Sequence, residues 1–167
     1  MSKRTRQYVG LLCAIAAYYL IHEGTHLIYA LMTGVFKQIN FMGLGIQIDI
    51  YAETMSDVQL GLFCLLGSVA TAVTGYALVL LAHKIGTVSS KLFKACMYYI
   101  TIAMLVIDPV YLSVLCAFFG GGDMNGISLL VPETVARMAY GIVFVINAVV
   151  FVKIVLPTYK RAFSETQ

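Results

Sequence analysis

The sequence predicts an all-α polytopic membrane protein with about four transmembrane helices and a small β-hairpin between the first and the second. Three observations support this fold class. Hydrophobic residues make up 60% of the 167-residue chain and charged residues only 11%, whereas soluble domains carry about 25% charged residues. Four segments of about 20 or more mostly apolar residues are long enough to cross a bilayer as helices. One connection instead alternates apolar and polar residues, as half-buried strands do.

The four apolar segments take up most of the chain, so we expect one membrane-embedded domain over residues 1–167. In order, these segments are 8–32, 58–82, 93–118 and 135–156. The first follows Lys3, Arg4 and Arg6, as a signal peptide would, but its apolar run is longer than a signal-peptide core and has no clear small-residue cleavage site. We therefore expect a permanent transmembrane helix there.

The distribution of basic residues predicts the orientation. Most Lys and Arg residues lie at the two termini and between the second and third apolar segments, whereas Lys37 and Arg137 fall on the opposite side. Because basic residues favour the cytoplasmic side, both termini are expected to be cytoplasmic in a multi-pass protein of a cell membrane. No basic run interleaved with aromatic residues indicates nucleic acid binding. The expected surroundings are the lipid bilayer.

The connection between the first and second apolar segments carries the predicted hairpin, over residues 36–52. The stretches FKQINFM and LGIQIDIYA alternate apolar and polar residues around Gly43 and Gly45, which is the pattern of paired strands. At the membrane face, the edges of such a hairpin must be paired or shielded by protein. An extended peptide could add to one edge. A plain surface hairpin is the equal alternative.

The second apolar segment contains small residues, and the third contains an Asp-Pro pair. The second, LLGSVATAVTGYAL, supplies small residues, including Gly67 and Gly75, which permit close approach of helix backbones. The third contains Asp108 and Pro109. We expect this pair to break or kink the helix, because proline lacks the amide donor and clashes with the preceding turn. A glycine-dense connection around Asp123 follows.

The first apolar segment contains the stretch HEGTH, residues 22–26. Four residues apart on a helix, His22 and His26 project from one face and can bind a single ion, with Glu23 beside it. A zinc ion held in this way keeps a position open for water, and Glu23 could accept a proton from that water as general base. A carboxylate near the bilayer centre costs about 2.5 to 3.5 kcal/mol on insertion scales. Metal coordination would offset that cost, which favours a metal site over a chance motif.

A third protein ligand is expected from a second acidic residue. Along straight helices, Asp108 lies as far into the third apolar segment as His22 lies into the first, roughly 21 Å at about 1.5 Å per residue. Asp123 would lie about 43 Å along an unbroken helix, beyond a hydrocarbon core of about 30 Å. It qualifies only if the chain folds back, which Pro109 and the glycines allow. Depth alone favours Asp108 and leaves Asp123 open.

Taken together, the chain resembles the site-2 protease family of intramembrane zinc metalloproteases over most of its length. The four matching stretches are HEGTH, INFMGLGIQIDI, LLGSVATAVTG and GGGDMNG. They resemble the family's metal-binding motif, the strands after it, its small-residue second helix and its aspartate-glycine motif. The resemblance implies that Asp123 completes the metal site with His22 and His26. The chain departs from the pattern where two residues separate Asp123 from Gly126.

The resemblance also implies the activity. It predicts a Zn²⁺-dependent endopeptidase, a hydrolase, that cleaves membrane-spanning or membrane-associated polypeptides with Glu23 as the catalytic base. One alternative is a non-proteolytic membrane assembly or binding factor that retains the fold, and another is a metal transporter that uses the histidines as a transit site. Replacement of Glu23 distinguishes these functions. Only a peptidase needs the Glu23 carboxylate for its activity, and the metal should stay bound without it.

Overall fold

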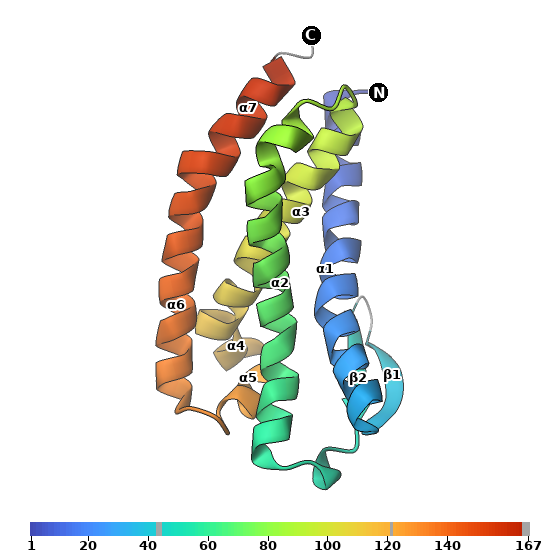
Figure 1. Cartoon of the computed structure of the whole chain (residues 1–167), viewed down its shortest axis with the longest axis vertical. Helices are drawn as coiled ribbons and strands as arrows, with labels where there is room; N and C mark the ends of the chain where they lie inside the picture. Colours follow the sequence, from blue (N-terminus) through green and yellow to red (C-terminus); the bar gives the residue numbers. More distant parts are fainter. Residues whose placement is uncertain (43–44, 121, 165–167) are drawn as a thin grey trace.

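The computed structural model describes residues 1–42, 45–120 and 122–164, and within these ranges it is a helical bundle with a small hairpin at one end (Figure 1). Four helical stretches of the described chain are long and apolar enough to cross a membrane, as the sequence predicts. They are α1 (Lys3–Thr33), α2 (Asp57–Gly86), α3 (Lys91–Val110) with its continuation to Phe119, and α6 (Glu133–Val150) with its continuation to Ser164.

The helix ends follow from local sequence. Serine hydroxyls at Ser2, Ser56 and Ser90 accept hydrogen bonds from backbone N–H groups in the first turns of α1, α2 and α3, which satisfies donors that a helix start leaves unpaired. At α2 the Gln59 side chain bonds back to the Ser56 backbone and completes a capping box. Helix α1 ends at Gly34, whose φ of 73° suits a residue without a Cβ. The polypeptide then turns directly into the hairpin.

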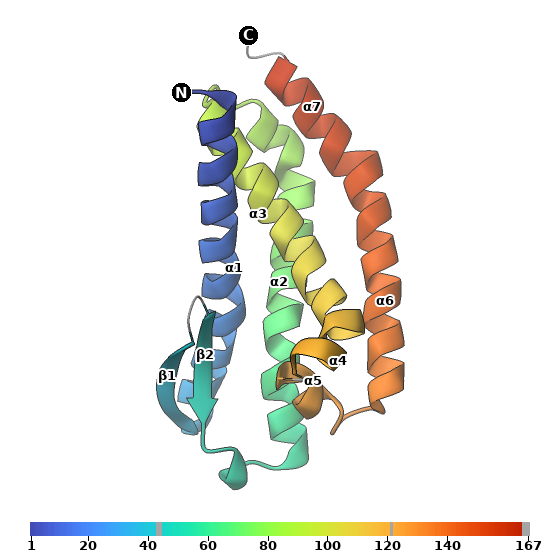
Figure 2. The same ribbon diagram turned by 180° about the vertical axis from the view of Figure 1, so that it is seen from behind.

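The predicted hairpin is present. Strands β1 (Phe36–Met42) and β2 (Gly45–Ile50) pair antiparallel, and Phe41 lies opposite Ile46. Gly43, at the expected turn, lies outside the described residues. In Figure 2, β1 is the outer strand and β2 is the inner one. On the hairpin surface Lys37 and Asp49 form an ion pair with a 3.1 Å separation, and this contact holds the pKa of the Asp49 carboxyl below its ordinary value.

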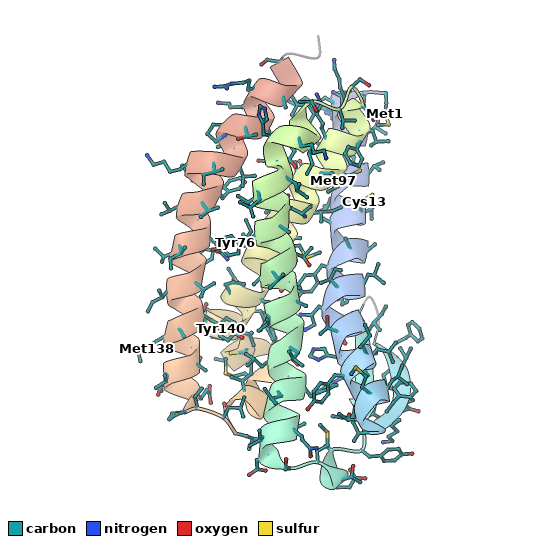
Figure 3. The ribbon with its side chains drawn as sticks, viewed as in Figure 1. Met1, Cys13, Tyr76, Met97, Met138 and Tyr140 are labelled. Atoms are coloured by element: carbon teal, nitrogen blue, oxygen red, sulfur yellow. The ribbon has the colours of Figure 1, made fainter. Side chains whose placement is uncertain are left out.

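Of the two expected outcomes at Pro109, a break does not occur, because α3 runs through this residue to Val110 before a π-helical turn begins at Tyr111. Proline supplies no N–H to the carbonyl of Leu105 one turn earlier. Instead, the side-chain amide of Asn147 on α6 donates to the Leu105 carbonyl oxygen at 2.6 Å, and the Asn147 amide oxygen accepts from the Tyr76 hydroxyl of α2 at 2.6 Å. Figure 3 places Tyr76 between α2 and α6. A neighbouring helix thus replaces the hydrogen bond that the proline removes.

The third helical stretch changes form after Pro109. A wide π-helical turn (Tyr111–Leu115) leads into the short helix α4 (Cys116–Phe119). There the stretch ends, and Gly120 has a φ of 94°, a conformation that favours glycine. The short helix α5 (Gly122–Ile127) follows and packs against α2 between the third stretch and α6 (Figure 2). The chain therefore folds back, as an Asp123 ligand requires.

The sixth helix continues through a second π-helical turn into α7 (Leu156–Ser164) and closes the bundle at the end that carries both termini (Figure 1). Two groups of buried apolar side chains fill the interior. One lies among α1, α2, β2 and α5 near the hairpin and includes Phe63, Leu112 and Met124. The other lies between α2, α3 and α7 near the termini and includes Leu105 and Tyr159.

Candidate metal centre

The structure brings His22, His26 and Asp123 together. Each residue offers one ligand atom, and the three atoms lie within 4.8 Å of one another. The Nε2 atom of His22 is 3.0 Å from one carboxylate oxygen of Asp123, and Nε2 of His26 is 3.6 Å from the other. Both histidines are buried, and Asp123 is partly buried. Two imidazole nitrogens and one carboxylate form a donor set that could hold a metal ion.

The fold-back after α4 positions Asp123. The Tyr111 hydroxyl donates to the Gly120 carbonyl oxygen at 2.6 Å and fixes the start of the return. In α5, Met124 and Ile127 are buried in the apolar cluster beside α2. Gly126 lies so close to α2 that a Cβ there would overlap the side chain of Cys64. This packing turns the carboxylate of Asp123 toward the histidines of α1.

Asp108 reaches the same site from the other side of an imidazole ring. Its carboxylate lies 3.2 Å from Nδ1 of His22, whereas Asp123 faces Nε2 of the same ring. The Tyr18 hydroxyl donates to Asp108 at 2.5 Å, and the Thr71 hydroxyl donates to its other oxygen. Asp108 is therefore placed to orient His22 and is not a member of the three-residue ligand group. The expectation from depth thus located a residue that contacts this group.

This arrangement of Asp108 matches a common feature of metal sites. A ligating histidine usually bonds its second ring nitrogen to a carboxylate, a carbonyl or water, which fixes the tautomer and the ring orientation. With Nδ1 of His22 directed to Asp108, Nε2 is left to act toward an ion near Asp123. Because Tyr18 and Thr71 both hold Asp108, it can keep this orientation without rearranging.

Two further observations test whether the site fits an ion. Among the described residues, both ring nitrogens of His26 are buried without a hydrogen-bond partner, and an unsatisfied buried polar group is costly unless something binds it. At Gly67 of α2, an added Cβ would lie 2.6 Å from Nε2 of His26 and 2.9 Å from Nε2 of His22. The glycine thus leaves free the space beside both nitrogens. The donor set, two nitrogens and an oxygen, is also one that zinc accepts in catalytic sites.

Glu23 lies on the same helix as the two histidines, and it is partly buried. It lines a cavity of about 890 Å³ together with His22, His26, Asp123 and the length of β2. The carboxylate also interacts with the backbone of Ile48. The cavity therefore contains the three-residue group, the Glu23 carboxylate and a strand in one continuous space.

The strand beside the cavity has an unpaired edge. The N–H of Tyr51 donates to Val35 at 2.9 Å, in line with the ladder. Because backbone groups alternate in direction along an antiparallel strand, the N–H groups of Ile46, Ile48 and Ile50 point away from β1. The Ile50 N–H donates to a local acceptor, the carboxylate of Asp49, at 3.1 Å. The edge near Glu23 is formed by Ile46 and Ile48.

Sequence reasoning singled out the three grouped residues, Glu23 and Asp108, but not the contacts made there by Tyr18, Thr71 and Gly67. Tyr18 precedes His22 by one helical turn on the same face, which is the signal that could have identified it. Thr71 and Gly67 come from α2, and only the packing of α2 against α1 brings them to the site. Comparisons of the chain with protein-family models, curated proteins and solved structures find no match.

Proposed function

We propose that this protein is a zinc-dependent intramembrane endopeptidase, related to the site-2 proteases that its sequence resembles. The observation that carries the proposal is the convergence of His22, His26 and Asp123 beside Glu23 in one cavity. Residues that are 100 positions apart in sequence meet there with unpartnered nitrogen atoms buried between helices. Such costly polar groups at the centre of an apolar bundle are expected at a functional site.

The surface of the bundle supports its insertion in a membrane. Large apolar side chains point outward along the long helices, among them Leu20, Leu80 and Phe118, each more than 70% exposed. Soluble proteins rarely expose contiguous apolar patches larger than a few hundred Å², and lipid chains would cover this surface. The proposed location is a cell membrane, with four spans and both termini in the cytoplasm, as the basic residues indicate.

In the proposed mechanism, His22, His26 and Asp123 hold the zinc ion. Zinc supplies Lewis acidity, which makes water a better nucleophile near neutral pH and a carbonyl a better electrophile. Glu23 accepts the proton of the attacking water and later delivers a proton to the leaving amine. Asp108 keeps His22 in the tautomer that directs Nε2 to the site.

The hairpin is proposed to present the substrate. A peptide bond inside a helix is shielded by its own hydrogen bonds, so cleavage needs an extended segment. The unpaired edge of β2 lines the cavity, and an extended peptide could add to it as a third strand. The backbone of Ile48 would then exchange its contact with Glu23 for one with the peptide, which would bring a substrate carbonyl beside the Glu23 carboxylate.

The decisive experiment uses Glu23→Gln. We expect purified Glu23→Gln protein to retain about one zinc ion per chain, because Glu23 is not in the ligand group, and to lose cleavage of a membrane peptide by about 10² to 10⁴ fold. Zinc is measured by elemental analysis, and cleavage by mass spectrometry of the products. In contrast, His22→Ala and Asp123→Asn are expected to lose both zinc and cleavage.

The same measurements separate the alternatives. A binding or assembly factor would be indifferent to Glu23→Gln, and a transporter would change zinc flux into vesicles without peptide products. Wild-type protein that folds in metal-replete conditions yet contains no divalent ion would refute the metal site itself. Zinc-loaded protein that cleaves no membrane peptide, with Glu23 intact, would refute only the protease assignment.

A further inference from the structure

A second cavity lies at the opposite end of the bundle from the hairpin, where both termini are found (Figure 1). It measures about 290 Å³ and lies among the first turns of α1, the first turns of α3 and the end of α7. Three of its lining residues are basic: Lys3 and Arg6 from α1, and Lys91 from α3. The rest of the lining consists of Gln7, Ala95 and the rings of Tyr98, Tyr99 and Phe163.

The charges around this cavity are all of one sign. Neither α1 nor α3 has an acidic residue in its first turn, although acidic residues stabilise helix starts. Instead, Lys3 and Lys91 place cations at the positive ends of two neighbouring helices. In the part of the chain that the structure describes, no carboxylate pairs with Lys3, Arg6 or Lys91. Like positive charges repel one another, and an anion placed between them would offset that repulsion.

The apolar side of the cavity is held in place by packing. The Lys94 ammonium donates to the Ala162 carbonyl oxygen at 2.6 Å and secures the end of α7, which brings Phe163 beside α3. The Tyr98 ring packs against Tyr159 with a centroid separation of 5.2 Å. Aromatic rings next to basic side chains are typical of the level at which lipid headgroups meet acyl chains. The cavity thus combines a cationic part with an aromatic wall.

We propose that this cavity binds the phosphate group of an anionic molecule, and that the molecule is a membrane lipid whose headgroup lies between α1 and α3. Lys3, Arg6 and Lys91 neutralise the phosphate, and the aromatic wall contacts the glycerol and the first carbons of the chains. Basic pockets between membrane helices are suited to anionic headgroups. This inference concerns a site separate from the metal centre and does not depend on peptidase activity.

The experiment measures lipid binding to the purified full-length protein in detergent by native mass spectrometry. Short-chain phosphatidylglycerol is compared with short-chain phosphatidylcholine, and glycerol phosphate represents the headgroup without chains. The test variant is Lys3→Gln/Lys91→Gln. The matched control is Lys84→Gln/Lys160→Gln, which removes two exposed positive charges from the same end of the bundle but outside the cavity. Circular dichroism reports on folding in each case.

We expect wild type to prefer phosphatidylglycerol, and the test variant to bind it about tenfold more weakly or worse, while the control stays close to wild type. Lys3→Arg/Lys91→Arg keeps both positive charges and is expected to bind phosphatidylglycerol about as wild type does. If glycerol phosphate binds as tightly with the same dependence on Lys3 and Lys91, the phosphate site stands and its occupant is a soluble phosphate compound. Equal losses in test and control variants, or no preference for phosphatidylglycerol, would overturn the proposal.

Discussion

At the scale of single residues, Gly67 determines how closely α2 can approach the candidate ligands. The absence of a side chain there leaves room beside Nε2 of both His22 and His26. A sequence search for small residues identifies Gly67 as one of several helix-packing positions, and it cannot show that this one faces two imidazoles. The difference matters because an added methyl group at Gly67 would crowd both of these imidazole nitrogens.

Replacement of Gly67 by alanine tests this role. We expect Gly67→Ala to reduce zinc affinity at least tenfold, because a Cβ would lie within 3 Å of both ligand nitrogens and would push the rings apart. Equilibrium dialysis with a zinc indicator measures the change. Gly24→Ala is the matched control, since a Cβ at Gly24 of α1 would meet no atom within 4 Å. Equal zinc affinity in the two variants would show that Gly67 has no role at the centre.

Asp108 acts through its contact with His22, so its replacement is expected to have a graded effect. Asp108→Asn should lower zinc affinity by about 10 to 100 fold while the fold persists, whereas Asp123→Asn should abolish specific binding because it removes a ligand. Zinc affinity is measured by competition with a chelator, and folding by circular dichroism. The reverse order of severity would make Asp108 the ligand and Asp123 the supporting residue.

At the scale of secondary structure, the two strands of the hairpin have different surroundings. Strand β2 lines the cavity, and β1 is the outer strand (Figure 2). The pair Phe41 and Ile46 illustrates the difference, since these residues lie directly opposite each other. By the alternation along the ladder, both of their N–H groups point away from the partner strand. Proline at either position removes an edge donor without removing a ladder hydrogen bond.

This symmetry provides a matched test of substrate presentation. We expect Ile46→Pro to reduce cleavage of a membrane peptide at least tenfold, because it removes a backbone donor from the edge that faces the cavity. Phe41→Pro should leave cleavage within about twofold of wild type. The readout is the initial rate of product formation, with zinc content as the folding control. Equal rates for the two zinc-replete variants would mean that the β2 edge does not bind substrate.

The elements also show how far sequence reasoning extends. The period of two in residues 36–52 correctly predicted both strands, and the apolar runs correctly predicted four long helices. The HEGTH spacing located three site residues on one turn of α1. The sequence allowed a break or a kink at Pro109, and the break does not occur because a compensating donor, Asn147, comes from α6. Depth along a straight helix could not locate Asp123, because the return at Gly120 is a tertiary feature.

At the scale of the whole molecule, the charge distribution predicts how the bundle is inserted. Both termini lie at one end of the bundle and the hairpin lies at the other (Figure 1). We expect reporter fusions at each terminus to indicate a cytoplasmic location, because basic residues cluster at that end. A reporter inserted between α5 and α6 should indicate the opposite side. An outward terminus would reverse the orientation, and the metal centre would then be reached from the cytoplasm.

The hydrogen bond from Asn147 to the Leu105 carbonyl has a consequence for how a polypeptide could enter the cavity. Sliding α6 away from α3 would leave that carbonyl bare among hydrocarbon chains, at a cost of several kcal/mol. No such bond ties β2 to the helices beyond α1 among the described residues. A substrate polypeptide that enters laterally from the bilayer is therefore expected to pass the hairpin. The interface between α3 and α6 should stay closed throughout turnover.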